Sequence, residues 1–245
     1  MKKLLLLAAL ASFGFALQSH AQDVDWDTSQ NMVGDTDVSN VGAPVDAVTT
    51  YGSPITLNGV TFNSVSGANT SGGVSSDGII SIANSGNGSP GAYGFAYNNP
   101  SAGNPTTLST DYNDLTSVIA FGYYGNGTVT ISDLTPGDTY QVQAWSYYSV
   151  GAGNNPAADT TYTGDNSVVL SATTGQFAIG TFTPATSTET FGYNFGANGG
   201  SYDVINAVSV REVSASVPEP ATFGMLAGGL GLLLAGQRIR RRIRS

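Results

Sequence analysis

The stretch TVTISDLTPGDTYQVQAWSYY, residues 128–148, determines the fold class. Its two ends are rich in β-branched and aromatic residues, which predicts strands over 128–132 and 139–148. Between them, Leu134–Asp138 predicts a turn, because Pro136 presets φ for a turn and Gly137 accepts positive φ without strain. The stretch therefore predicts two strands joined by a tight connection.

The same pattern recurs along residues 22–214, where helical periodicity is hard to find. Asn58-Gly59 predicts a tight turn within Ile55–Val65. Further strands are predicted over 78–82, 117–124, 167–171, 176–183, 188–195 and 202–211. Residues 84–114, rich in Asn, Gly and Ser, predict a long loop that is either functional or a loose insertion. The sequence thus predicts an all-β chain whose body, 22–214, is a single β-sandwich or jelly roll.

The charges are unevenly placed along the 245 residues. Two of the eight basic residues lie at the N-terminus and five at the C-terminus, so Arg211 is the one base in 22–216, against 16 acids. This segment has a formal charge of −15 and would repel a polyanion. We therefore exclude nucleic acid as a partner.

Several catalytic classes are excluded by composition. The chain has no cysteine, and its single histidine, His20, and its lysines, Lys2 and Lys3, fall in a segment that we expect to be removed. This excludes Ser-His-Asp and Cys-His catalysis, histidine-ligated zinc and Schiff-base chemistry. Paired carboxylates remain, with Glu189 and Glu212 as the glutamates before Glu219. A carboxylate-dependent glycoside hydrolase is the least favoured hypothesis, and we expect no enzyme.

Residues 1–21 have the three parts of a secretory signal peptide. Lys2 and Lys3 form the basic part, Leu4–Leu17 the apolar part, and Ser19-His20-Ala21 the cleavage site. We expect export through the Sec translocon and removal by signal peptidase, which leaves Gln22 as the first residue. The alternative is an uncleaved membrane anchor.

The C-terminal segment 215–245 predicts a membrane anchor. Residues 221–236 are uncharged and largely apolar, and as a helix they would span about 24 Å, which flanking arginines can extend. The tail 238–244 would stay cytoplasmic by the positive-inside rule, with the body in the periplasm and the helix in the inner membrane. Its basic residues are Arg238, Arg240, Arg241, Arg242 and Arg244.

An extended motif precedes this helix. Its residues, 217–222, are Val217, Pro218, Glu219, Pro220, Ala221 and Thr222. The order of this motif, an apolar span and an arginine cluster resembles the PEP-CTERM sorting segment. The resemblance implies a substrate of an exosortase, a membrane-embedded protease or transpeptidase, and delivery to the cell surface or extracellular matrix. The alternative is a plain tail anchor.

A second resemblance covers most of the body. Leu57–Phe62 (LNGVTF), Leu134–Tyr140 (LTPGDTY) and Ile205–Arg211 (INAVSVR) occur in this order. Together they are similar to uncharacterised PEP-CTERM proteins with a galactose-binding-like jelly roll. The resemblance implies a carbohydrate-associated sandwich, although such folds host many functions.

The strand 139–148 carries the predicted binding residues. The side chains expected to face the core are Tyr140, Val142, Ala144 and Tyr148, and the alternate side chains would point the other way. Aromatic rings stack on sugars and amides bond their hydroxyls, which predicts an exposed sugar-binding face. Its residues are Gln141, Gln143, Trp145 and Tyr147. The alternative is that this face is covered.

A structural calcium ion is the one cofactor that the sequence suggests. Asp23, Asp25 and Asp27 alternate, and Asp35 and Asp37 follow closely, which could supply hard oxygen ligands in an irregular loop. The pattern does not fit an EF-hand, which needs Gly at the sixth position and Glu at the twelfth. The alternative is a solvated acidic strand.

These observations leave two main hypotheses for the exported body. The first is a non-catalytic, carbohydrate-associated module that contacts exopolysaccharide, supported by the strand 139–148. The second is a purely structural surface or matrix protein without a specific ligand, supported by its few charges and its Asn- and Gly-rich loop.

Overall fold

The computed structural model describes residues 22–50, 52–65, 72–74, 77–85, 93–97, 108–123, 126–148, 159–195 and 202–214. The chain separates into two units, Met1–Ser214 and Ala215–Ser245, and every described residue belongs to the first. The predicted signal peptide (1–21), sorting motif (217–222), membrane helix (221–236) and basic tail (238–244) lie outside the described residues. Among the helices that are described, none is long and apolar enough to cross a membrane.

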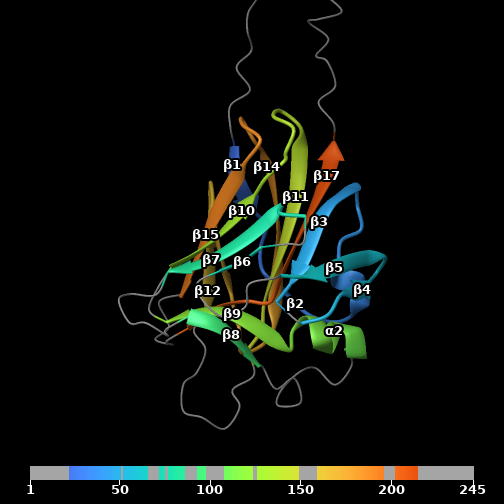
Figure 1. Ribbon diagram of the computed structural model, residues 1–245, viewed down its shortest axis with the longest axis vertical. Helices are drawn as coiled ribbons and strands as arrows, with labels where there is room; N and C mark the ends of the chain where they lie inside the picture. Colours follow the sequence, from blue (N-terminus) through green and yellow to red (C-terminus); the bar gives the residue numbers. More distant parts are fainter. Residues whose placement is uncertain are drawn as a thin grey trace, which may run out of the picture. The chain divides into compact units, whose positions relative to one another are not determined.

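The body is a β-sandwich, which confirms the predicted fold class (Figure 1). The first sheet has the order β1 (Gln22–Trp26), β14 (Gln176–Thr183), β11 (Thr139–Ser146), β17 (Ala207–Ser214), β3 (Ala43–Thr49), β5 (Val60–Ser64), β4 (Ile55–Leu57), with β2 (Gln30–Asn31) also on β14. The second has the order β13 (Ser167–Leu170), β12 (Thr160–Thr163), β15 (Glu189–Phe195), β10 (Asn126–Ile131), β7 (Ile80–Ser85), β6 (Gly72–Val74). A third, smaller sheet has the order β16 (Tyr202–Ile205), β9 (Val118–Tyr123), β8 (Tyr93–Tyr97).

The turn that decided the fold class connects the two large sheets. β10 lies in the second sheet and β11 in the first, so Leu134–Asp138 carries the chain from one layer to the other. Gly137 has φ 88°, as its predicted role requires, and Asp133 also has positive φ, at 59°. The turn is fixed by the backbone N–H of Thr135, which donates to the Tyr140 hydroxyl at 2.8 Å.

The main hydrophobic core lies between the two large sheets. Along β11, Tyr140, Val142 and Ala144 point into it, as the alternation predicts. Trp26, from β1 of the same sheet, packs across the core against Tyr162 and Phe191 of the second sheet, with ring centroids 5.5 and 5.2 Å apart. The core therefore forms where the inward-facing positions of both sheets meet.

A second hydrophobic core covers the other face of the first sheet. It contains Phe62 from β5, Trp145 from β11 and Leu115 from the helix α2 (Thr110–Leu115). Ser109 caps α2 by accepting the backbone N–H of Tyr112 at 3.1 Å. The predicted loop over 84–114 was thus wrong in part, because it contains β8 and all of α2 except the last residue of that helix.

The two ends of the described body lie together. Figure 1 shows the start of β1 and the end of β17 at the same end of the sandwich, and α2 near the opposite end beside β4. The η2 turn (Asp35–Asp37) precedes β3 in the chain. α2 and β4, which contribute to the second core, are therefore remote from Ser214, where the described body ends.

Gly180 tests the packing of β1 on β14. A Cβ at this position would lie 2.6 Å from Val24 Cγ1 and 2.9 Å from Trp26 Cε3. We expect Gly180→Ala to lower the free energy of unfolding by about 1–3 kcal/mol, as overpacking does. Gly52→Ala is the matched control, because nothing lies within 4 Å of the point that its Cβ would occupy. Chemical denaturation measures both, and equal stabilities would contradict the close packing.

Candidate functional site

The predicted sugar-binding face of β11 is covered. Trp145 and Tyr147 are 0% exposed, Gln143 is 1% exposed and Gln141 is half-buried. The expectation of an exposed face was therefore wrong, and the alternative of a covered face is correct. The alternation was correct for Tyr140, Val142 and Ala144, whereas Tyr148 lies beyond the end of β11 and is half-buried. Both faces of β11 are buried, one in each hydrophobic core.

The amides of this face bind the chain itself. Residues 32–40, which we call the strap, cross the outer face of the first sheet. The Gln143 amide accepts the backbone N–H of Ser39 at 2.9 Å and donates to the carbonyl of Asp37 at 2.7 Å. The Ser39 hydroxyl donates to Gln141 Oε1. Both glutamines are thus occupied by the strap, which takes the place that we predicted for sugar hydroxyls.

The aromatic part of the face is closed by α2. Trp145 Nε1 donates to the Tyr112 hydroxyl at 3.1 Å, and that hydroxyl donates to Asp37 Oδ2 at 3.4 Å. Burial, and then the negative charge of Asp37, raise the pKa of Tyr112 above its ordinary value. The phenol therefore stays neutral at physiological pH and links the strap to the indole.

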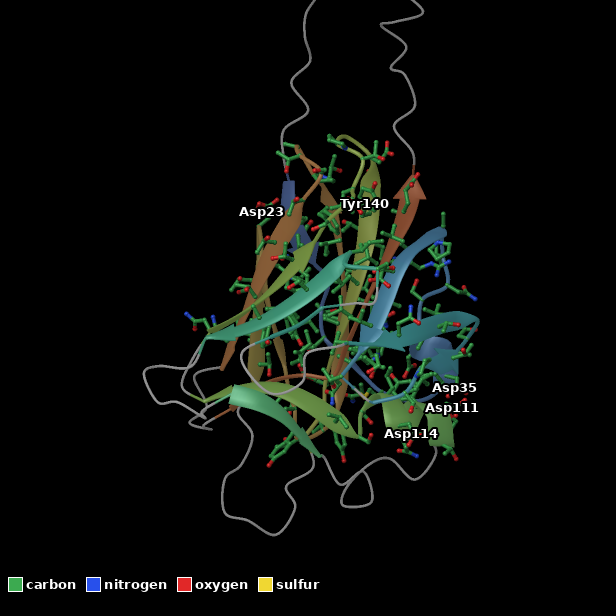
Figure 2. All side chains as sticks on the ribbon, viewed as in Figure 1. Asp23, Asp35, Asp111, Asp114 and Tyr140 are labelled. Carbon is green, nitrogen blue, oxygen red and sulfur yellow. The ribbon has the colours of Figure 1, made fainter. Side chains whose placement is uncertain are left out.

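The five aspartates proposed as calcium ligands do not form one cluster. Asp23, Asp25 and Asp27 are exposed at β1, whereas Asp35 and Asp37 are half-buried in the strap. Figure 2 shows Asp23 and Asp35 in different parts of the body. Across the described residues, no group of three or more His, Cys, Asp or Glu side chains could hold a metal ion.

The two aspartates of the strap instead accept hydrogen bonds from the protein. Asp37 Oδ2 accepts the backbone N–H groups of Val33 and Gly34, at 2.6 and 3.0 Å. Asp35 Oδ1 accepts the Ser109 hydroxyl at 2.6 Å. Both carboxylates therefore have a structural role, since they shape the strap and tie it to the start of α2.

Glu189 is a buried acid of the second sheet. It is 9% exposed, and its burial, followed by the charges of Asp23 and Asp165, raises the pKa of its carboxyl. Glu212 lies on β17 in the first sheet, and Glu189 on β15 in the second. The two glutamates that remained for a hydrolase thus belong to different sheets.

The sequence reasoning missed a groove of about 330 Å³ at the side of the first sheet. Pro44, Asp46, Asn63, Ser209 and Arg211 are among the residues that line it. They come from β3 and β5, which are close together in the sequence, and from β17, which is far from both. The one signal that pointed to it was Arg211, the single base in a strongly acidic segment.

Tyr112→Phe tests the contact between Trp145 and the helix. It leaves the buried indole N–H without an acceptor, so we expect the free energy of unfolding to fall by about 1–3 kcal/mol at neutral pH. The same change in a Trp145→Phe background should cost less, because the donor is gone. Equal costs in the two backgrounds, measured by chemical denaturation, would argue against the hydrogen bond.

Glu189→Gln tests the buried carboxyl. Because the folded-state pKa is raised, wild-type stability is fully present below the unfolded-state pKa and falls as the pH rises through the folded-state pKa. We expect the variant to melt at a higher temperature than wild type at neutral pH, and the difference to vanish in acid. Glu212→Gln is the control, because it also removes one negative charge from the acidic body. A Tm difference independent of pH would contradict the raised pKa.

Comparison with known proteins bears on the C-terminal segment. No curated protein matches the chain. Among solved structures, the chain is similar to the crystal structure of the enzymatically active domain of bacteriophage CBA120 tailspike protein 4, at 13% identity and a TM-score of 0.34. That likeness covers 55% of this chain and 19% of the other. Residues 216–242 match the PEP-CTERM protein-sorting motif, which supports export and processing by an exosortase.

Proposed function

We propose that this chain is a non-catalytic protein of the cell surface or extracellular matrix, which an exosortase-type enzyme processes after export. The observation that carries the proposal is the match of residues 216–242 to the PEP-CTERM sorting motif. A proline-flanked glutamate at 218–220 disfavours helix and keeps the chain extended, which suits a processing enzyme. The body would be the part that is delivered.

The predicted route follows from the two ends of the sequence. The signal peptide would direct the chain to the Sec translocon and signal peptidase. The apolar stretch 221–236 and the arginines behind it would then hold the body on the periplasmic side of the inner membrane. Processing near Glu219 would release the body from this anchor toward the cell surface.

Two versions of the body's role remain, and the structural version is better supported. The carbohydrate version rested on the outer face of β11, where Gln143 and Trp145 are buried beneath the strap and α2. A glycan cannot reach these side chains while the strap is in place. A role as a surface or matrix module without a ligand on β11 needs only the stable sandwich that the two cores provide.

The proposal that the body is not an enzyme rests on its functional groups. Residues 22–214 contain no histidine, cysteine or lysine. Glu189, the perturbed acid, and Glu212 lie in different sheets, and the groove is lined by neither. A hydrolase would need two carboxyl groups on either side of one bond. The carboxyl groups that line the groove, Asp46 and Asp77, each accept a neighbouring backbone N–H, from Ala47 and Ile79, which favours a structural role for both.

Glu219→Ala tests the sorting assignment in a host that carries an exosortase. We expect the processed form to fall by about tenfold or more, and the full-length chain to accumulate in the membrane fraction. Glu212→Ala, the same change outside the matched segment, is the matched control and should be processed normally. Immunoblots of membrane, surface and culture fractions measure both forms. Normal processing of Glu219→Ala, or normal processing in a host that lacks the exosortase, would refute the assignment.

A further inference from the structure

The groove lies where two strands of the first sheet part. β3 and β5 run parallel and pair at Val48 with Asn63 and at Thr49 with Ser64. Before these positions β3 continues along β17, whereas no pairing with β5 occurs. The opening between them is the groove of about 330 Å³, bounded by the β4–β5 turn at Gly59 and by Asp77 before β7.

Three features of β3 keep this opening from closing into a regular ladder. Pro44 has no backbone N–H to offer to a neighbouring strand. A bulge opposite Val210 and Arg211 breaks the register of β3 at this point. The backbone N–H of Ala47 is taken by the side chain of Asp46, at 2.8 Å. The groove is therefore built into the strand rather than left by loose packing.

Two polar side chains of the groove, those of Asn63 and Ser209, have no hydrogen-bond partner among the described residues. Ser209 is 2% exposed, and neither its hydroxyl nor the Asn63 amide bonds to a described residue. Neither group is among the described side-chain atoms that are buried without a partner, so both are accessible from the groove to water or to a ligand. The two side chains thus offer one hydroxyl and one amide to a bound molecule.

Arg211 adds a fixed set of donors. Its Nε donates to the carbonyl of Val41 at 2.8 Å, and its Nη2 to the carbonyl of Gly42 at 2.6 Å. No described residue accepts from Nη1. The two bonds hold the guanidinium in place at the groove, so its remaining N–H groups would donate with little loss of side-chain entropy.

The lining selects the chemistry of the ligand. Arg211 and Asn63 donate, and the carboxylates of Asp46 and Asp77 line the same groove as acceptors. A ligand that matches both kinds of group carries several hydroxyls, each of which donates and accepts. An anion is disfavoured by the two carboxylates and by the acidic body, and an apolar ligand by the polar lining.

We propose that this groove binds one neutral sugar unit, either as a free sugar or as part of a neutral polysaccharide. Its volume is at the lower end of the range for small-molecule sites, which fits a single ring better than a long oligosaccharide. The site is separate from the outer face of β11 near Trp145, and the proposal does not depend on the sorting assignment.

Calorimetric titration of the full exported chain, purified in detergent, tests this proposal. The probes are a panel of neutral monosaccharides and a neutral polysaccharide panel. We expect saturable binding of at least one probe, and about tenfold weaker binding after Asn63→Ala or Ser209→Ala. Ser187→Ala, on an exposed turn, is the matched control and should bind as wild type does. Thermal unfolding of each variant verifies that its fold is intact.

The outcomes distinguish a free sugar from a unit of a polysaccharide as the ligand, and they distinguish both from failure of the proposal. Binding of a monosaccharide assigns a free sugar or a chain end, whereas binding of a polysaccharide alone, weakened by Asn63→Ala, assigns a unit within a chain. Absence of saturable binding to both panels would overturn the proposal. So would binding that Asn63→Ala and Ser209→Ala leave unchanged.

Discussion

The buried amide of Gln143 is the constraint on which the architecture of the first sheet depends. An amide with 1% exposure must have its donors and acceptors satisfied within the protein, or the strand loses stability. The strap meets this demand with one backbone N–H and one carbonyl, from Ser39 and Asp37. Once the strap is fixed there, Asp37 reaches Tyr112, and Tyr112 reaches Trp145. One polar residue in the central strand thus aligns the strap, α2 and the second core.

Several of the acidic residues of the body also stabilise its backbone. Residues 22–214 contain fourteen aspartates and two glutamates. The short aspartate side chain reaches backbone N–H groups close to it in the sequence, which a glutamate does less well. Asp37 binds the N–H groups of Val33 and Gly34, Asp46 that of Ala47, and Asp77 that of Ile79. Part of the charge that repels polyanions therefore also shapes turns and a strand edge.

Local signals in the sequence predicted the strands well, because turn chemistry is local. Asn58-Gly59 forms the predicted tight turn, with φ of 46° and 76°, and β14 has the predicted bounds. The prediction of one strand over 202–211 was wrong at Asn206, which separates β16 from β17. Its side chain accepts the backbone N–H of Tyr147 and donates to the carbonyls of Thr116 and Val118. These partners are remote in the sequence, so no local pattern could indicate them.

The prediction of an exposed sugar-binding face on β11 was wrong for a related reason. Alternation assigns side chains to two faces, but it does not say what covers each face. Gln141 and Gln143 favoured a solvent-exposed face because side-chain amides are usually exposed. The sequence of the strap carries no signal that it would bind these two amides. β3 was missed because Pro44 and Asp46 interrupt the strand pattern.

With both faces of β11 buried, recognition by the described body falls to the edges of its sheets and to its turns. A strand edge carries unpaired backbone groups that another chain can extend, and Pro44 and the bond from Ala47 to Asp46 limit this at β3. The same features leave the neighbouring strand pair open, so that polar side chains from β5 and β17 line one groove. Protection of an edge and formation of a binding site can therefore arise from a single interruption of the ladder. In this body, the bulge in β3 and the bond from Ala47 to Asp46 interrupt the ladder, and the groove lies at this interruption.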